Sequence, residues 1–148
     1  MIVAGALQWA GSRFLPQAKN VAVVRLPQDV PAFFFCVLTF LSAASFEELL
    51  FRAFVPLCLK EILINAAITR QKALTERTKK AAMLSAITVS GILFALSHRY
   101  LGALAVLNAI FAHGILTACL LRTKSLAFPS LAHFLYNMVN LVILSGCK

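Results

Sequence analysis

Two adjacent glutamates, Glu47 and Glu48, follow a long apolar stretch, and Arg52 comes one helical turn after the second. At i, i+4 spacing Glu48 and Arg52 share one face of a helix, where an ion pair would lower the cost of burying both charges. Glu47 lies about 100° further round the helix, so it cannot share that geometry. A carboxyl without a basic partner suits a group that accepts and returns a proton.

Two histidines lie in other apolar stretches of the chain. His98 closes the segment "FALSH", with Phe94 one turn before it on the same face. His133 opens the segment "HFLYN", with Asn137 one turn after it. A single histidine in a membrane helix more often hydrogen-bonds to a neighbouring helix than it catalyses a reaction. Two histidines and an unpaired glutamate could form a hydrolytic site, provided that they meet.

The elements that must position these groups are membrane helices. The chain has 148 residues, of which 61% are hydrophobic and 13% are charged, and its mean hydropathy is +0.87. A soluble domain needs far more polar surface than this. One span takes about 20 apolar residues, and the apolar runs show no strand alternation. We therefore predict an all-α polytopic membrane bundle of about four to five helices.

Four apolar runs are candidates for the spans: residues 31–64, 81–98, 103–121 and 126–146. The first is too long for one perpendicular crossing, so we predict a tilted helix that kinks near Pro56 and leaves the membrane around Lys60. The basic segments 65–80 and 122–125 are predicted to be cytoplasmic loops. Residues 1–30 form an N-terminal segment, either a helix remnant or an interfacial segment held by Trp9. Residues 31–148 form the core domain.

The net charge of +9 does not indicate a nucleic-acid partner, because the basic residues collect in short connections between apolar runs. The four cysteines are widely separated and form no CxxC pair, which disfavours a structural zinc site and a disulfide framework. We expect buried free thiols.

The predicted topology brings the polar groups to comparable depths. If the helices on either side of residues 65–80 form an antiparallel hairpin, Glu47 and His98 both lie roughly 25 Å from the loop side. His133 lies roughly 12–15 Å deep from the second basic loop, and Asn137 about 6 Å deeper. A tilted last helix would close this gap.

These residues also form a family pattern. "EELLFR" matches EExxxR, "FALSH" matches FxxxH and "HFLYN" matches HxxxN, in this order and each in an apolar segment. The chain resembles the CPBP (Abi) family, which includes the type II CAAX prenyl endopeptidases and bacteriocin-processing proteins. The matching motifs extend from Phe46 to Asn137. Typical family members carry further membrane helices before the first motif, so the resemblance implies a bundle truncated relative to them.

The resemblance implies an intramembrane endopeptidase of the CAAX type. Glu47, assisted by His98, would activate the attacking water, and His133 and Asn137 would form the oxyanion site. Glu48 and Arg52 would be a supporting ion pair, and Phe94 a supporting residue. The expected partners are a peptide or protein substrate, prenylated or small, and the lipid bilayer of a prokaryotic inner membrane. No nucleic acid is expected.

Several alternatives stay open at this point. Glu47, His98 and His133 form a zinc-ligand set by type, although HExxH is absent, so a zinc metalloprotease is an alternative to a glutamate base alone. A non-enzymatic immunity or scaffold protein would need the Glu48–Arg52 pair but not Glu47. Too few spans disfavour a transporter. We expect His113 and Asn108 to be core residues, with substrate lining as the alternative.

Overall fold

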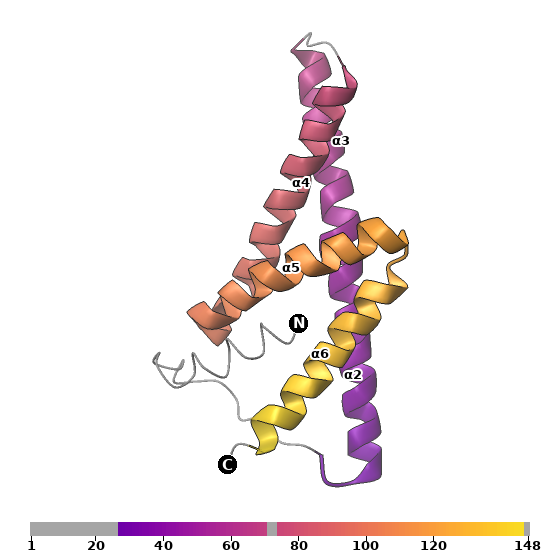
Figure 1. Ribbon diagram of the computed structural model, residues 1–148, viewed down its shortest axis with the longest axis vertical. Helices are drawn as coiled ribbons and strands as arrows, with labels where there is room; N and C mark the ends of the chain where they lie inside the picture. The colour runs from indigo at the N-terminus through magenta and orange to yellow at the C-terminus, as the bar shows by residue number, and fades with distance from the viewer. Residues whose placement is uncertain (1–26, 71–73, 147–148) are drawn as a thin grey trace.

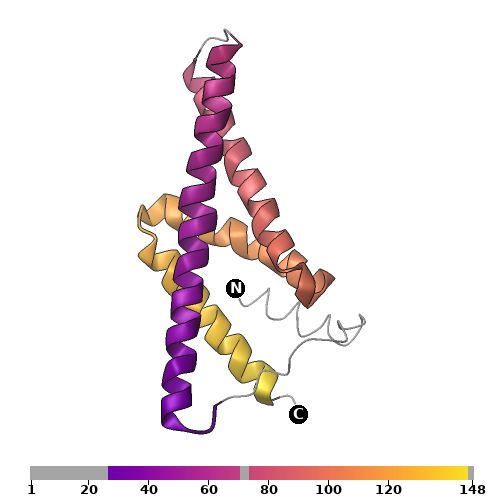
Figure 2. The ribbon, with the colours of Figure 1, turned by 180° about the vertical axis from the view of Figure 1, so that it is seen from behind.

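The computed structural model describes residues 27–70 and 74–146 as a bundle of helices, and this part of the chain contains no strand. One long helix runs the length of the molecule; two of the three shorter helices pack along it, and the third connects those two (Figures 1 and 2). The long helix consists of three segments, α2 (Val30–Glu48), the π-helical η1 (Leu49–Phe54) and α3 (Val55–Thr69). The shorter helices are α4 (Glu76–Ser97), α5 (Ala103–Thr123) and α6 (Ala127–Gly146).

The shorter helices contact different ends of the long one. Helix α4 runs back along α3, and α6 lies obliquely against α2 at the opposite end (Figure 1). Helix α5 connects them, packing on α4 and on α6. The all-α membrane bundle predicted from composition is confirmed, with four helices in the described residues if α2, η1 and α3 count as one. The predicted N-terminal segment lies almost wholly outside the described residues, so the division at residue 30 stays a prediction.

The long helix begins at a capped N-terminus. The carboxylate of Asp29 accepts a hydrogen bond of 2.7 Å from the Ala32 N–H, and Pro31 occupies the first turn, where its missing N–H costs nothing. These features explain why the helix starts at Val30.

At Pro56, where the sequence predicts a kink, the long helix accommodates the proline by the π-helical segment η1. Proline lacks an N–H and its ring clashes with the carbonyl four residues earlier, so a regular α-helix cannot continue unchanged through it. Here the Val55 N–H donates to the Leu50 carbonyl, five residues back. The wider turn leaves the Phe51 carbonyl without its usual partners, because Val55 is taken and Pro56 has no donor. The Ser90 hydroxyl of α4 donates to that carbonyl instead.

The loop predicted at residues 65–80 is much shorter than expected. Helix α3 continues to Thr69 and α4 begins at Glu76. The Thr75 hydroxyl caps α4 by accepting from the Thr78 N–H at 3.2 Å, and Lys79 pairs with Glu76 at 2.9 Å on the exposed surface. Polar residues of this kind are good helix formers, so both helices extend beyond the apolar runs.

Among the residues that the structure describes, three helices are long and apolar enough to cross a membrane: the continuous helix Val30–Thr69, α4 and α5. Helix α6 contributes a shorter apolar stretch, Ala127–Ile143. The connection between α4 and α5 is a short 3₁₀ turn, η2 (Arg99–Leu101), followed by Gly102 at φ 99°. Only glycine adopts this φ readily, so the chain reverses there.

Candidate active site

The centre of the site is an ion pair on the long helix. Arg52 Nη1 lies 2.9 Å from Glu48 Oε1, and neither side chain is exposed at all. The i, i+4 pairing that the sequence predicts is therefore present. The guanidinium also lies over the Phe94 ring, with 4.2 Å between the Arg52 Cζ atom and the ring centroid. This cation–π contact adds stabilisation where water is excluded.

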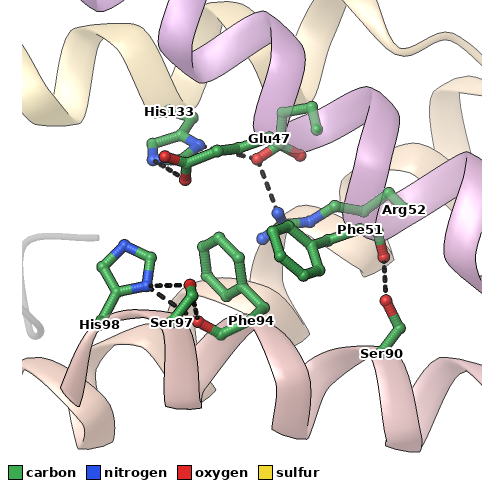
Figure 3. Close-up of polar contacts among 9 residues, drawn as sticks. Glu47, Phe51, Arg52, Ser90, Phe94, Ser97, His98 and His133 are labelled. Atoms are coloured by element: carbon green, nitrogen blue, oxygen red, sulfur yellow. Dashed lines mark hydrogen bonds and ion pairs between the residues drawn. The ribbon is translucent and has the colours of Figure 1, made fainter.

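His133 of α6 joins the ion pair from the opposite helix. Its Nδ1 lies 2.8 Å from Glu48 Oε1, the same oxygen that contacts Arg52. An ionised carboxylate can only accept, so Nδ1 carries the proton. The ring is thereby oriented with its Nε2 toward Glu47, 3.8 Å from Oε2 (Figure 3). The sequence did not predict the contact between His133 and Glu48.

Glu47 occupies the position next to this network without belonging to it. Its side chain is one-third exposed, yet its Oε2 atom is enclosed and makes no hydrogen bond within the described residues. The distance to His133 Nε2 is too long for a good hydrogen bond. A separation of this size is one at which a water molecule can contact both groups.

His98 ends α4 in a fixed orientation. Its Nδ1 lies 2.9 Å from the Phe94 carbonyl and 3.1 Å from the Ser97 hydroxyl. Because a carbonyl only accepts, Nδ1 carries the proton and Nε2 of the neutral ring keeps its lone pair. Figure 3 shows this second nitrogen pointing toward the side where Glu47 and His133 lie. The orientation suits a base that faces the same space.

Phe94 connects these groups by ring contacts. Its centroid lies 4.8 Å from that of His98, 6.2 Å from that of His133 and 5.3 Å from that of Phe51. The residue is only 2% exposed. Phe51 and Phe94 are equally far in sequence from the midpoint of the α3–α4 connection. Their contact therefore shows the antiparallel register on which the predicted equal depth of Glu47 and His98 depends.

Asn137 is the predicted site residue that the structure does not join to the others. It lies on α6 one turn after His133 and is half-buried, but no hydrogen bond links it to Glu47, His98 or His133 in the described part. The neighbouring Tyr136 instead accepts a hydrogen bond from Asn108 of α5. The sequence offered a signal for that contact, since both are polar groups within apolar runs.

The zinc-ligand set does not assemble in this conformation. Among residues 27–70 and 74–146, no three His, Cys, Asp or Glu side chains gather as a metal site. Glu47 Oε2 and His133 Nε2 lie 3.8 Å apart. The hydrogen bonds of His133 and His98 use Nδ1 and not Nε2, an arrangement that metal-binding histidines also show. The three side chains are not gathered around one point in the described residues, and the zinc alternative stays a prediction.

Comparison with known proteins decides the family. The profile of the type II CAAX prenyl endopeptidase Rce1-like family matches residues 29–139, three-quarters of the chain and every predicted site residue. The chain belongs to this family. No curated protein and no solved structure matches it.

Membership in the Rce1-like family carries two consequences. The chain is an integral membrane protein, in agreement with its three spanning-length helices. It belongs to a family of CAAX-type endopeptidases, which are hydrolases that cut peptide bonds.

Proposed function

We propose that this protein is an intramembrane endopeptidase in which Glu47 activates water. The observation that supports this most directly is the Glu47 Oε2 atom, enclosed and without a hydrogen bond, 3.8 Å from His133 Nε2. Glu48 also has an enclosed oxygen without a hydrogen bond, Oε2, but its Oε1 is held by Arg52 and His133. No such contact fixes the carboxylate of Glu47 in the described residues. An enclosed oxygen left free beside a histidine suits a group whose partner is a transient water.

The proposed reaction needs no covalent intermediate. Glu47 accepts one proton from water while the water oxygen attacks the carbonyl carbon of the scissile peptide bond, and the Nε2 lone pair of His98 assists this transfer. The C–N bond of the tetrahedral intermediate then breaks, and the proton returns to the leaving amine nitrogen.

Negative charge develops on the carbonyl oxygen during this step. Nε2 of His133, as a donor in the protonated ring, would stabilise that oxyanion, and the carboxylate of Glu48 would balance the charge on the ring. Asn137, one turn further along α6, would donate from its amide once substrate is bound. Glu48 and Arg52 orient His133 rather than react.

The proposed substrate is a peptide segment held at the membrane, either a prenylated C-terminus or a small peptide. The proposed location is a prokaryotic inner membrane. The family supports a CAAX-type substrate, and the position of Glu47 on a helix of spanning length supports cleavage of a segment held at the membrane.

A cleavage assay tests the proposal. The purified protein in lipid nanodiscs is incubated with a farnesylated CAAX peptide and with its unmodified form, and products are identified by mass spectrometry. Glu47→Gln keeps the size of the side chain but removes the base, so kcat should fall about 10²–10⁴-fold. The matched control is Glu61→Gln, which changes an exposed glutamate of the same helix.

The competing hypothesis, a non-enzymatic scaffold, predicts a different result. A scaffold needs Glu48, Arg52 and His133 for packing, but Glu47 forms no hydrogen bond that a scaffold would require. If wild type cuts and Glu47→Gln cuts equally well, the assignment of the base is wrong. If wild type cuts neither peptide, the result favours the scaffold hypothesis over an endopeptidase that acts on CAAX peptides.

A further inference from the structure

A small cavity, partly open to the surface, lies behind the ion pair, between η1, α3, α4 and α5. Its volume is about 20 Å³, and its polar lining comes from Arg52, His113 and Thr117. Apolar side chains, including Phe51, Pro56 and Ile87, form the rest of the wall. A space of this size holds about one water molecule.

The polar atoms around this cavity lack protein partners. Arg52 Nε and Nη2, and the Thr117 hydroxyl, are enclosed and make no hydrogen bond within the described residues. His113 is 7% exposed, and its imidazole lies beside the Ile87 carbonyl without a hydrogen bond of good geometry. Each enclosed polar group without a partner destabilises the folded protein. A single water that contacts several of them would remove most of that destabilisation.

The helices hold the two α5 residues in place for this role. His113 and Thr117 are four residues apart, so they face the same side of α5. The ring of His113 lies where a Cβ atom of Gly91 would be, because a Cβ built there would come within 2.7 Å of His113 Cδ2. Gly91 therefore allows the imidazole to reach the cavity wall.

We propose that this cavity binds one structural water, which bridges the Arg52 guanidinium to Thr117 and His113. Arg52 donates to the water oxygen, and the two water protons are donated to the Thr117 hydroxyl oxygen and to an imidazole nitrogen of His113. An apolar cavity of this size would stay empty, whereas one with several polar partners is hydrated. His113, which no family motif contains, thus belongs to the support of the charged centre.

Thr117 and His113 are then positioning residues. They act through the water on Arg52, which holds the Glu48 oxygen that also orients His133. The positioning role rests on the proposed function, whereas the bound water does not.

A crystal structure of the protein in a lipid phase, at a resolution that shows ordered waters, tests the site directly. We expect an oxygen peak within hydrogen-bond distance of Arg52, Thr117 and His113. The peak should be lost in Thr117→Val, which keeps the shape of the side chain, and kept in Thr117→Ser. An empty cavity in the wild type overturns the proposal.

Kinetics and thermal unfolding test the role of the water. Thr117→Val should lower kcat about tenfold with little change in KM, and Thr117→Ser should restore it. Thr88→Val is the matched control, because the Thr88 hydroxyl is exposed and bonds only within its own helix. An unchanged kcat in Thr117→Val, with wild type active, overturns the positioning role. If wild type cuts nothing, the proposed function fails. The bound water is still tested, because its presence predicts the oxygen peak and a melting temperature of Thr117→Val below that of Thr88→Val.

Discussion

The substitution Gly91→Ala adds one methyl group between α4 and α5 and should show how tightly the two helices pack. The Cβ of an alanine there would lie 2.7 Å from His113 Cδ2 and 3.0 Å from Nε2, so the imidazole must move. It has little room to do so, because His113 is buried and its ring lies 5.9 Å, centroid to centroid, from that of Phe94. Overpacking of this kind costs about 1–3 kcal/mol.

Gly114 provides the matched control, since a Cβ built there meets nothing within 4 Å. Both glycines lie inside helices, where alanine is preferred over glycine by about 0.5–1 kcal/mol. This gain applies to both variants and cancels in the comparison. The difference between Gly91→Ala and Gly114→Ala is then the overpacking cost alone. For a chain of this size it corresponds to a melting temperature about 2–12 °C lower for Gly91→Ala.

Thermal unfolding of both variants in the same detergent measures this difference. A second comparison isolates the cause: once His113→Ala has removed the ring, adding Gly91→Ala should cost nothing. Two results would refute the reasoning. One is a Gly91→Ala variant with the same melting temperature as Gly114→Ala. The other is a Gly91→Ala substitution that lowers the melting temperature just as much in the His113→Ala background.

Three further predictions concern the charged centre and the hairpin. Glu48→Gln should destabilise the fold by about 3–5 kcal/mol by leaving a buried guanidinium unpaired, whereas Glu61→Gln at the exposed pair should cost under about 1 kcal/mol; equal melting temperatures would contradict this. Ser90→Ala should cost about 1–3 kcal/mol by leaving a carbonyl of η1 unsatisfied, measured against Ser85→Ala on the exposed face of the same helix. Cleavage by wild type should survive treatment with 1,10-phenanthroline, and loss of activity that zinc restores would show a metal requirement.

The sequence predicted the helices well because apolar length and basic flanks report directly on membrane spans. The run at residues 81–98 became α4, and the run at residues 103–121 became α5. The spacing of Glu48 and Arg52 predicted their contact, because i, i+4 geometry is a property of one helix. The prediction of a loop over residues 65–80 was wrong, because charge density indicates exposure to water and an exposed segment can still be helical.

The position of His133 could not be derived in the same way. Depth along a helix follows from residue count only when the helix stands perpendicular to the membrane, and α6 runs obliquely against α2 (Figure 2). The prediction also placed both basic loops at the same level, whereas the α5–α6 connection lies about midway along the long helix (Figure 1), and α6 runs from there to bring His133 to Glu48. The π-helical turn could not be predicted either, since a proline predicts a disturbed helix but not the form that the disturbance takes.

Stability and proposed catalysis are coupled through one oxygen atom. Glu48 Oε1 contacts both Arg52 and His133, so changing any of these three alters the fold and the orientation of the site together. A loss of activity in such a variant would not distinguish a catalytic from a structural role. Glu47 is different, because its enclosed Oε2 carries no hydrogen bond that the fold depends on. A Glu47→Gln protein should therefore melt like wild type, so that its activity reports on the chemistry alone.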